Sequence, residues 1–292
     1  MLSILIPTYN YDVFPLVENL QKQAIKANIT FEVLVFDDAS QNHFNNSKIN
    51  ELNNCSFTIL HQNIGRSAIR NLLAKTAKYE WLLFLDADVC PMNNNLISNY
   101  LQAYDTPEKV IYGGIRYQEE RPSDKQLLRW VYGNKREALP ASIRNKEEHL
   151  SFLTLNFFIH KSVFDQVSFN EKIPNLRYED VLFSYDLQQK NVRVKHIENP
   201  VYHLGIESSA VFLEKTKQAI EGLKYLLDNN LIDIKYVRLS KYLHLIERTG
   251  RKKLIAFGFK LSKNSLEKHF LSSKPNLFLF DLYRLGYLCS LK

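Results

Sequence analysis

Short apolar runs alternate with amphipathic stretches along the first 90 residues of the chain. Four runs have the length of strands, and two stretches between them repeat apolar residues at helical spacing. The predicted order is strand Leu2–Ile6, helix Asp12–Lys26, strand Phe31–Phe36, strand Phe57–Leu60, helix Arg66–Ala77 and strand Trp81–Leu85. Strands that are apolar throughout are typical of parallel sheets buried on both faces. The pattern therefore predicts a doubly wound α/β fold with mostly parallel strands.

A second set of elements continues to about residue 205. We expect helices over 94–104, 162–167 and 179–190, and strands over 110–115, 152–159 and 192–197. Residues 118–150 are polar and irregular, which predicts a mobile loop or lid over a site. Beyond residue 206 the pattern is helical. These patterns predict an α/β domain over 1–205 and a basic, aromatic, mainly helical region over 206–292.

Two carboxylates follow the strand Trp81–Leu85 directly. Asp86 and Asp88 are separated by one small residue, so in an extended chain both side chains point to the same side. A buried carboxylate is costly unless it is paired or bound to a metal. The strand end therefore predicts a site for a divalent cation and its phosphate ligands.

Other polar groups fall at comparable positions. Asp37 and Asp38 end a predicted strand, where they suit either a ligand site or a simple turn. Gly65 precedes a predicted helix, whose free N–H groups favour anions. Arg66 and Arg70 lie one helical turn apart, suited to phosphate, to pairing with Asp38, or to a solvated basic face.

Two further positions complete the candidate chemistry. Glu179 and Asp180 begin a predicted helix, where acids commonly act as caps but could also supply a general base. His203 follows the last predicted strand and could complete the coordination of a metal or simply pack there.

Charge and composition indicate in which cellular compartment this chemistry takes place. Three scattered cysteines favour a reducing compartment. There is no basic leader, and no apolar run approaches the roughly 18 residues of a spanning helix, so we expect a cytoplasmic protein. The net charge is +7, and residues 231–292 hold 13 Lys/Arg against 4 Asp/Glu. That segment could lie on the inner face of an anionic membrane or pack with a solvated basic side.

Taken in order, these motifs resemble the family 2 glycosyltransferases of the GT-A fold. The matching segments are Ser3–Asn10, Val35–Ser40, Asn63–Gly65 with Arg70-Asn71, Leu85–Asp88, Asn156 before Phe157–Ile159, Glu179-Asp180 and His203. The resemblance covers about residues 1–205. The chain has Arg177-Tyr178 where a glycine commonly precedes the acidic pair, on the acceptor side of the site.

The resemblance implies a nucleotide-sugar site and a divalent cation, Mn²⁺ or Mg²⁺. The implied donor-binding residues are Pro7, Tyr9, Asp37, Asp38, Asn63, Gly65, Arg66, Arg70 and Asp86. Asp88 would bind the metal directly, with Asp86 and His203 as further candidates, although Asp86 fits the ribose or sugar better. Family analogy makes UDP the expected nucleotide.

The resemblance also implies an inverting single displacement, with Asp180 as base beside Glu179. The acceptor would be a glycan or lipid-linked molecule in the synthesis of surface polysaccharide or glycoconjugate. One rival is a nucleotidyltransferase, which expects a Gly-rich basic loop after the first strand, where Pro7–Asp12 has neither glycine nor a basic residue. Another is a degenerate, non-catalytic glycan-binding or scaffold protein. No nucleic-acid partner is expected, because the basic excess lies in one segment without a binding motif.

Overall fold

A computed structural model describes residues 1–42, 44–104, 107–175 and 177–291. These residues form two compact units. The first consists of Met1–Tyr117, Ala138–Asn175 and Glu179–Gly205, and the second of Gln118–Glu137, Arg177 with Tyr178, and Ile206–Lys292. The predicted division at residue 205 placed residues 118–137 in the first part. In the structure these residues belong to the second unit, which is therefore built from separate stretches of the chain.

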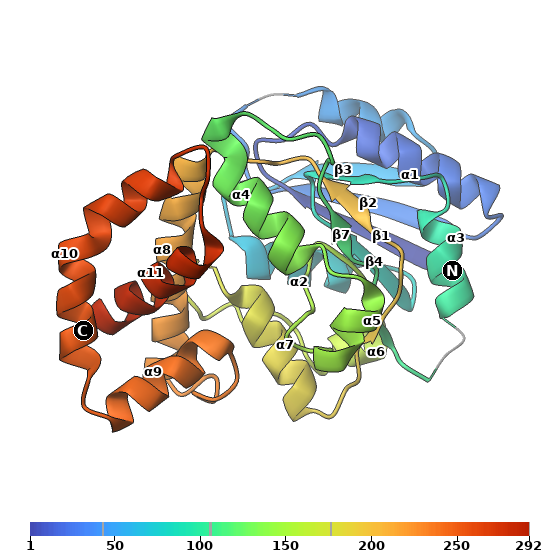
Figure 1. The fold of residues 1–292 in the computed structure, drawn as a ribbon. Coiled ribbons are helices and arrows are strands. Elements are labelled where there is room, and N and C mark those ends of the chain that lie inside the picture. The colour runs from blue at the N-terminus through green and yellow to red at the C-terminus, as the bar shows by residue number, and fades with distance from the viewer. Residues whose placement is uncertain (43, 105–106, 176, 292) are drawn as a thin grey trace. The chain divides into compact units, whose positions relative to one another are not determined.

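The first unit is built on a seven-stranded sheet in the order β3-β2-β1-β4-β8-β6-β9 (Figure 1). Its strands are β1 (Leu2–Thr8), β2 (Phe31–Asp37), β3 (Cys55–Ile59), β4 (Trp81–Leu85), β6 (Val110–Tyr112), β8 (Asn156–His160) and β9 (Lys195–His196). Neighbouring strands are parallel except where β8 pairs with β4 and β6. The predicted α/β fold with a mixed, mostly parallel sheet is confirmed.

A second, three-stranded sheet in the order β5-β10-β7 lies in the same unit. Its strands are β5 (Val89–Pro91), β7 (Ile115–Arg116) and β10 (Val201–His203). Because β5 begins directly after Asp88 and pairs antiparallel with β10, His203 comes opposite Val89. This pairing brings His203, the last predicted site residue, close to the segment Asp86–Asp88, which we call the DXD segment.

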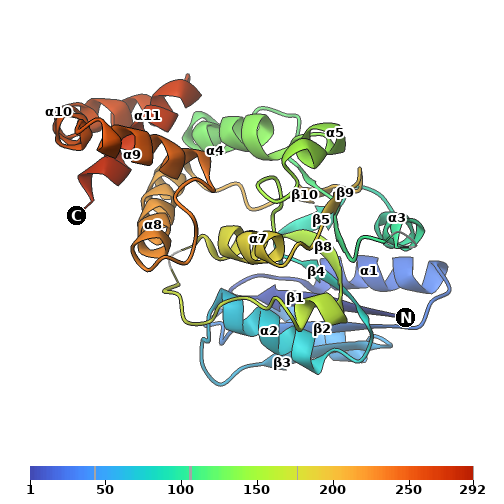
Figure 2. The ribbon, with the colours of Figure 1, turned by 90° about the horizontal axis from the view of Figure 1, so that it is seen from below.

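Helices cover both faces of the large sheet (Figure 2). The helices of the first unit are α1 (Phe14–Lys26), η1 (Asn45–Glu51), α2 (Arg66–Thr76), α3 (Leu96–Ala103), α5 (Ala141–Arg144), η4 (Asn145–Glu147), α6 (Lys161–Phe164) and α7 (Glu179–Gln189). Alternate residues such as Leu82 and Phe84 of β4 pack with α2, α6 and α7 in one core cluster. The intervening Leu83 is fully buried on the other face, so β4 is apolar on both sides.

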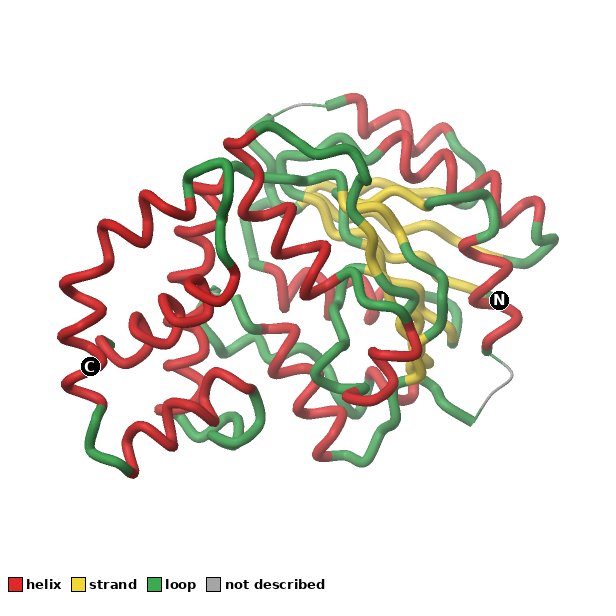
Figure 3. Tube along the Cα trace, viewed as in Figure 1, coloured by secondary structure: helices red, strands yellow, loops and turns green. Residues whose placement is uncertain are grey.

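The regular secondary structure of the second unit is helical, with loops between the helices, among its described residues (Figure 3). Its elements are η2 (Asp124–Gln126), α4 (Leu127–Tyr132), η3 (Gly133–Glu137), α8 (Ser209–Asp228), α9 (Arg238–Arg248), α10 (Lys252–Phe270) and α11 (Leu277–Ser290). Leu128 of α4, Leu213 of α8, Phe259 of α10 and Tyr283 of α11 share one core cluster. The prediction of a helical C-terminal region is confirmed.

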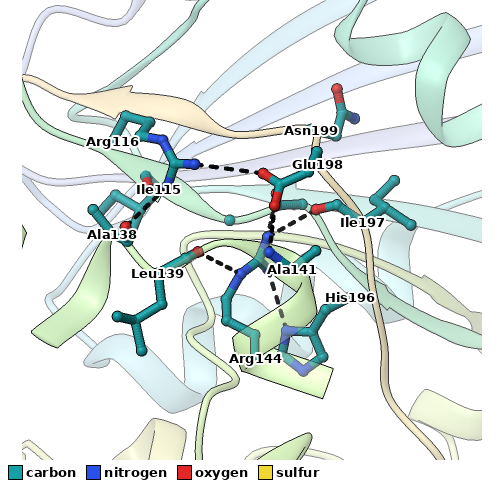
Figure 4. Close-up of polar contacts among 12 residues, drawn as sticks. Ile115, Arg116, Ala138, Leu139, Ala141, Arg144, His196, Ile197, Glu198 and Asn199 are labelled. Atoms are coloured by element: carbon teal, nitrogen blue, oxygen red, sulfur yellow. Dashed lines mark hydrogen bonds and ion pairs between the residues drawn. The ribbon is translucent and has the colours of Figure 1, made fainter. Parts of the chain in front are cut away.

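Residues 118–150 were expected to be an irregular loop, and that prediction is wrong. The segment forms η2, α4, η3, α5 and η4. Arg144 is 1% exposed and donates hydrogen bonds to the carbonyl oxygens of Leu139, Gly113 and Ile197 (Figure 4). A buried arginine stabilises the surrounding segment only when its N–H donors have hydrogen-bond acceptors. The sequence pattern alone does not reveal these acceptors.

Candidate functional site at the carboxyl ends of the strands

The loops after β1 and β2 are held together by their own polar side chains. Pairing of the parallel strands places Thr8 opposite Asp37, so both strands end at the same edge. The Asn10 backbone amide donates to the Ser40 hydroxyl oxygen at 2.6 Å, and the Ser40 backbone amide donates to the Asp37 carboxylate at 2.7 Å. Ala39 adopts a φ of 61°, in the left-handed region. This edge therefore has a fixed backbone shape rather than a free loop.

Asp38 is bound to the backbone before α2. Its two carboxylate oxygens accept the amides of Ile64 and Gly65 at 2.7 and 3.0 Å, and the Asn63 side chain donates to the Asp38 carbonyl. Gly65, at a φ of 85°, allows the sharp entry into α2. The alternative in which Asp38 pairs with Arg66 or Arg70 is not observed among the described residues. Asp38 instead shapes the predicted nucleotide loop.

Pro7 and Tyr9 flank this edge from the end of β1. Pro7 lies within β1 and is partly buried, and the Tyr9 side chain is 49% exposed. An aromatic ring exposed beside the fixed loops offers a face on which a planar base can stack. Their predicted contact with the nucleotide stays a prediction.

Arg70 connects the DXD segment to the acidic pair on α7. Its guanidinium lies 2.7 Å from the Asp86 carboxylate and 4.0 Å from that of Glu179, and it is 5% exposed. Arg66, one turn earlier on α2, lies 3.7 Å from Glu179. The buried Nε of Arg70 has no hydrogen-bond partner among the described residues. The two arginines therefore join Asp86 and Glu179 in one charged cluster.

Asp88 faces His203 across the small sheet. Their Oδ2 and Nε2 atoms are 3.4 Å apart, and the Asp88 carbonyl accepts the amide of Leu204. Gly205 is required here, because a Cβ at that position would lie 2.4 Å from Asp88 Oδ2. The buried Nδ1 atom of His203 has no hydrogen-bond partner among the described residues. Asp88 and His203 were predicted from their positions at strand ends together with the family resemblance, whereas nothing in the sequence indicated Gly205.

The third predicted metal candidate, Asp86, is not part of this pair. No group of three His, Cys, Asp or Glu side chains that could hold a metal is found in the part of the chain that the structure describes. Asp86 is bound by Arg70 instead. Any cation at Asp88 and His203 would therefore take its remaining ligands from water or from the donor.

Tyr11, which the sequence analysis did not select, lies close enough to Asp88 to respond to its charge. Burial raises the pKa of the Tyr11 hydroxyl, and the negative charge of Asp88 raises this pKa further. Tyr11 could have been selected from its place in the polar loop after β1, because loops at the carboxyl ends of the strands line the site.

Asp180 has the electrostatic environment of a general base. Burial raises the pKa of its carboxyl to about 6, and the charge of the adjacent Glu179 acts in the same direction. The Val181 amide, at 2.8 Å, and the charge of Arg70 act against this rise. A carboxyl poised near neutral pH accepts a proton more effectively than one with an ordinary pKa near 4.

The residues before the acidic pair have an unusual backbone. Arg177 and Tyr178 adopt φ values of 91° and 76°, both in the region that favours glycine. A glycine at either position would adopt this conformation without strain. In this chain, a hydrogen bond between Tyr178 and Arg284 of α11 accompanies the unfavourable conformation.

Asn156 of the matching motifs has a structural place. It is fully buried, its amide donates to the carbonyls of Gly114 and Asn199 at 3.0 Å, and its oxygen accepts the Tyr100 hydroxyl at 2.8 Å. These bonds join β8 to the turns around the small sheet. The sequence motif is therefore a packing feature near the site.

The sheet and its helices have the arrangement of the GT-A type of glycosyltransferase. Residues 3–168, more than half of the chain, match the family described as Glycosyl transferase family 2. The chain therefore belongs to glycosyl transferase family 2.

Individual relatives agree with this assignment. An uncharacterized glycosyltransferase of Haemophilus influenzae is 36% identical over 96 residues, which are 32% of this chain and 31% of that protein. The mannosyltransferase PcManGT from Pyrobaculum calidifontis, solved in complex with GDP-Man and Mn²⁺, gives a TM-score of 0.55 at 12% identity over 97% of this chain and 85% of that one. TarS 1-349 of S. aureus gives 0.50 at 17% identity over 99% and 90%. The two structures share the fold.

The helices were also searched for membrane spans. Within the described residues, none combines the length and apolar character needed to cross a bilayer.

Proposed function

We propose that this protein is a metal-dependent, inverting glycosyltransferase that uses a nucleoside-diphosphate sugar. The observation that carries the proposal is the pairing of Asp88 with His203. Asp88 lies two residues after Asp86, which is bound by Arg70. A carboxylate and an imidazole beside a strand-end acid suit a divalent cation that binds a diphosphate. The acceptor in this proposal is a hydroxyl group of a glycan or of a lipid-linked molecule.

The donor atoms present fit a divalent cation. Two ligands on neighbouring positions of an ion with bonds of about 2.1 Å lie roughly 3 Å apart, close to the 3.4 Å between Asp88 and His203. When bound, Mn²⁺ or Mg²⁺ would neutralise charge on the departing diphosphate. The Mn²⁺ bound with GDP-Man in PcManGT supports the proposal for this fold.

The nucleotide would lie on the fixed edge formed by Pro7, Tyr9, Asp37 and Asp38 with the loop of Asn63 and Gly65. Asp38 holds that loop through two backbone amides, so it acts by shaping the pocket. Asp86 would accept the ribose or sugar hydroxyls, held in place by Arg70. UDP is our first choice of nucleotide by family analogy, and GDP is the second.

The reaction requires one proton acceptor. The acceptor oxygen forms a bond to the anomeric carbon as the bond from that carbon to the diphosphate oxygen breaks. The bonding pair leaves with the nucleoside diphosphate, and the hydroxyl proton passes to the Asp180 carboxylate. Arg66 and Arg70 lie within 4.0 Å of Glu179, and the charge of Glu179 raises the proton affinity of Asp180.

The test is a screen of UDP- and GDP-sugars for release of nucleoside diphosphate with Mn²⁺ or Mg²⁺. We expect metal-dependent release from one donor, lost in Asp88→Asn and retained in a matched variant at an exposed site, Asp165→Asn. Donor binding by calorimetry without turnover would instead support the degenerate, non-catalytic alternative. Release of sugar 1-phosphate rather than nucleoside diphosphate would support a nucleotidyltransferase and contradict our proposal.

A further inference from the structure

Helix α10 has apolar side chains on two opposite sides. One side, with Phe259 and Phe270, packs into the core of the helical unit, where Phe259 contacts Tyr283 of α11. The other side carries Leu254, Phe257 and Leu261, whose exposed fractions are 70, 61 and 71%. At 3.6 residues per turn these three lie in one stripe, opposite the buried side.

No described element covers this stripe. Within the helical unit, α11 lies between α8 and α10, so α10 forms an outer layer (Figure 1). A solvent-facing helix stripe is ordinarily polar, and contiguous exposed apolar side chains mark an interaction surface. The neighbouring α9 adds Tyr242 and Leu245, which are 58 and 57% exposed.

The charges around the stripe identify the kind of partner. Residues 238–270 contain nine Lys/Arg against two Asp/Glu, a net charge of +7 that equals that of the whole chain. Lys253 and Lys260 are exposed and flank the apolar stripe along α10. Lys252 pairs with Glu247 and Lys263 lies near Glu267, whereas the other seven have no ion pair among the described residues.

We propose that α10, with α9, docks on an anionic lipid surface. Leu254, Phe257 and Leu261 would enter the boundary between headgroups and acyl chains, while Lys253 and Lys260 would contact the headgroups. Basic charge alone would equally suit nucleic acid, but three exposed apolar side chains beside the lysines suit a lipid interface. This partner is independent of the proposed transfer reaction.

The test is co-sedimentation of the full chain with vesicles of phosphatidylglycerol and phosphatidylcholine at low salt. We expect binding that weakens with salt and with removal of phosphatidylglycerol. The variant Leu254→Ser/Phe257→Ser/Leu261→Ser should reduce partitioning at least 10-fold, and Lys253→Gln/Lys260→Gln about 10-fold. The control Ile25→Ser/Lys26→Gln, exposed positions on α1, should bind as the unmodified chain does.

Three outcomes would overturn the proposal. One is equal vesicle binding by the serine variant, which would show that the apolar stripe does not enter lipid. Another is an unmodified chain that binds single-stranded RNA but not vesicles, together with loss of this RNA binding in the glutamine variant. That result would indicate a nucleic-acid surface. The third is self-association of the unmodified chain in sedimentation velocity, abolished in the serine variant, which would assign the stripe to a second copy. Donor hydrolysis is measured in parallel, so a failure here is distinct from a failure of the proposed transferase activity.

Discussion

The guanidinium of Arg70 lies 2.7 Å from the carboxylate of Asp86, and the arginine is almost fully buried. The pair connects the end of β4 to α2, and the same arginine reaches toward Glu179 of α7. A single side chain thus links the proposed donor-binding acid to the proposed catalytic acids.

Removing Arg70 should cost both stability and donor binding. We expect Arg70→Met to lower the free energy of unfolding by about 2–4 kcal/mol, because it removes the ion partner of Asp86 in a partly buried site and leaves Glu179 with Arg66 alone. Urea unfolding measures this loss. The double variant Arg70→Met/Asp86→Asn should lose less than the sum of the single variants, and strict additivity would contradict a direct coupling.

Asp180→Asn should abolish transfer while retaining donor binding. The expected loss of turnover is about 10²–10⁴-fold, because the acceptor hydroxyl loses its base. In the unmodified protein, kcat/KM should rise with pH through about 6, the pKa at which Asp180 loses its proton. Near-normal turnover in the variant would exclude Asp180 as the base.

The same carboxyl should make the folded state less stable as the pH rises from about 4 to 6. The folded protein holds the Asp180 proton more tightly than the unfolded chain, whose aspartates titrate near 3.9, so stability is lost as the pH rises through that range. Asp180→Asn removes this penalty and should raise the free energy of unfolding by about 2–3 kcal/mol at pH 7.5. Thermal unfolding of both proteins at pH 4 and 7.5 measures the difference, which should vanish at the lower pH.

Gly205→Ala tests the metal pair without changing a ligand. The added Cβ would lie 2.4 Å from Asp88 Oδ2, so the carboxylate must move from its position facing His203. We expect the affinity for Mn²⁺ in the presence of nucleotide to fall about 10-fold, as for loss of a positioning contact around a metal. Calorimetric titration measures this affinity, and an unchanged value would contradict the assignment of Asp88.

Gly65→Ala tests the loop that Asp38 holds. There is space for the Cβ, whose nearest neighbours are 3.7 Å away, but the φ of 85° is unfavourable for any residue with a side chain. We expect a loss of about 1–3 kcal/mol in the free energy of unfolding. Gly258→Ala on α10, where the Cβ would meet nothing within 4 Å, is the control and should stabilise the protein by roughly 0.5–1 kcal/mol.

The local pattern of the sequence determined the first half of the sheet and the order of the site residues. The predicted strand Trp81–Leu85 matches β4, and α2 begins at Arg66 as predicted, because both depend on local periodicity and on Gly65. The acids after β4 were visible because charge follows an apolar run.

Only the tertiary structure decided how these residues pair. Arg70 binds Asp86 rather than Asp38, because the Asp38 oxygens are already occupied by backbone amides from a loop about 26 residues away. The helices in 118–150 escaped prediction, since Arg144 is buried by carbonyl groups that lie far from it in the sequence. Local periodicity reports which residues share a face, whereas partners brought together by chain crossings decide which charges meet.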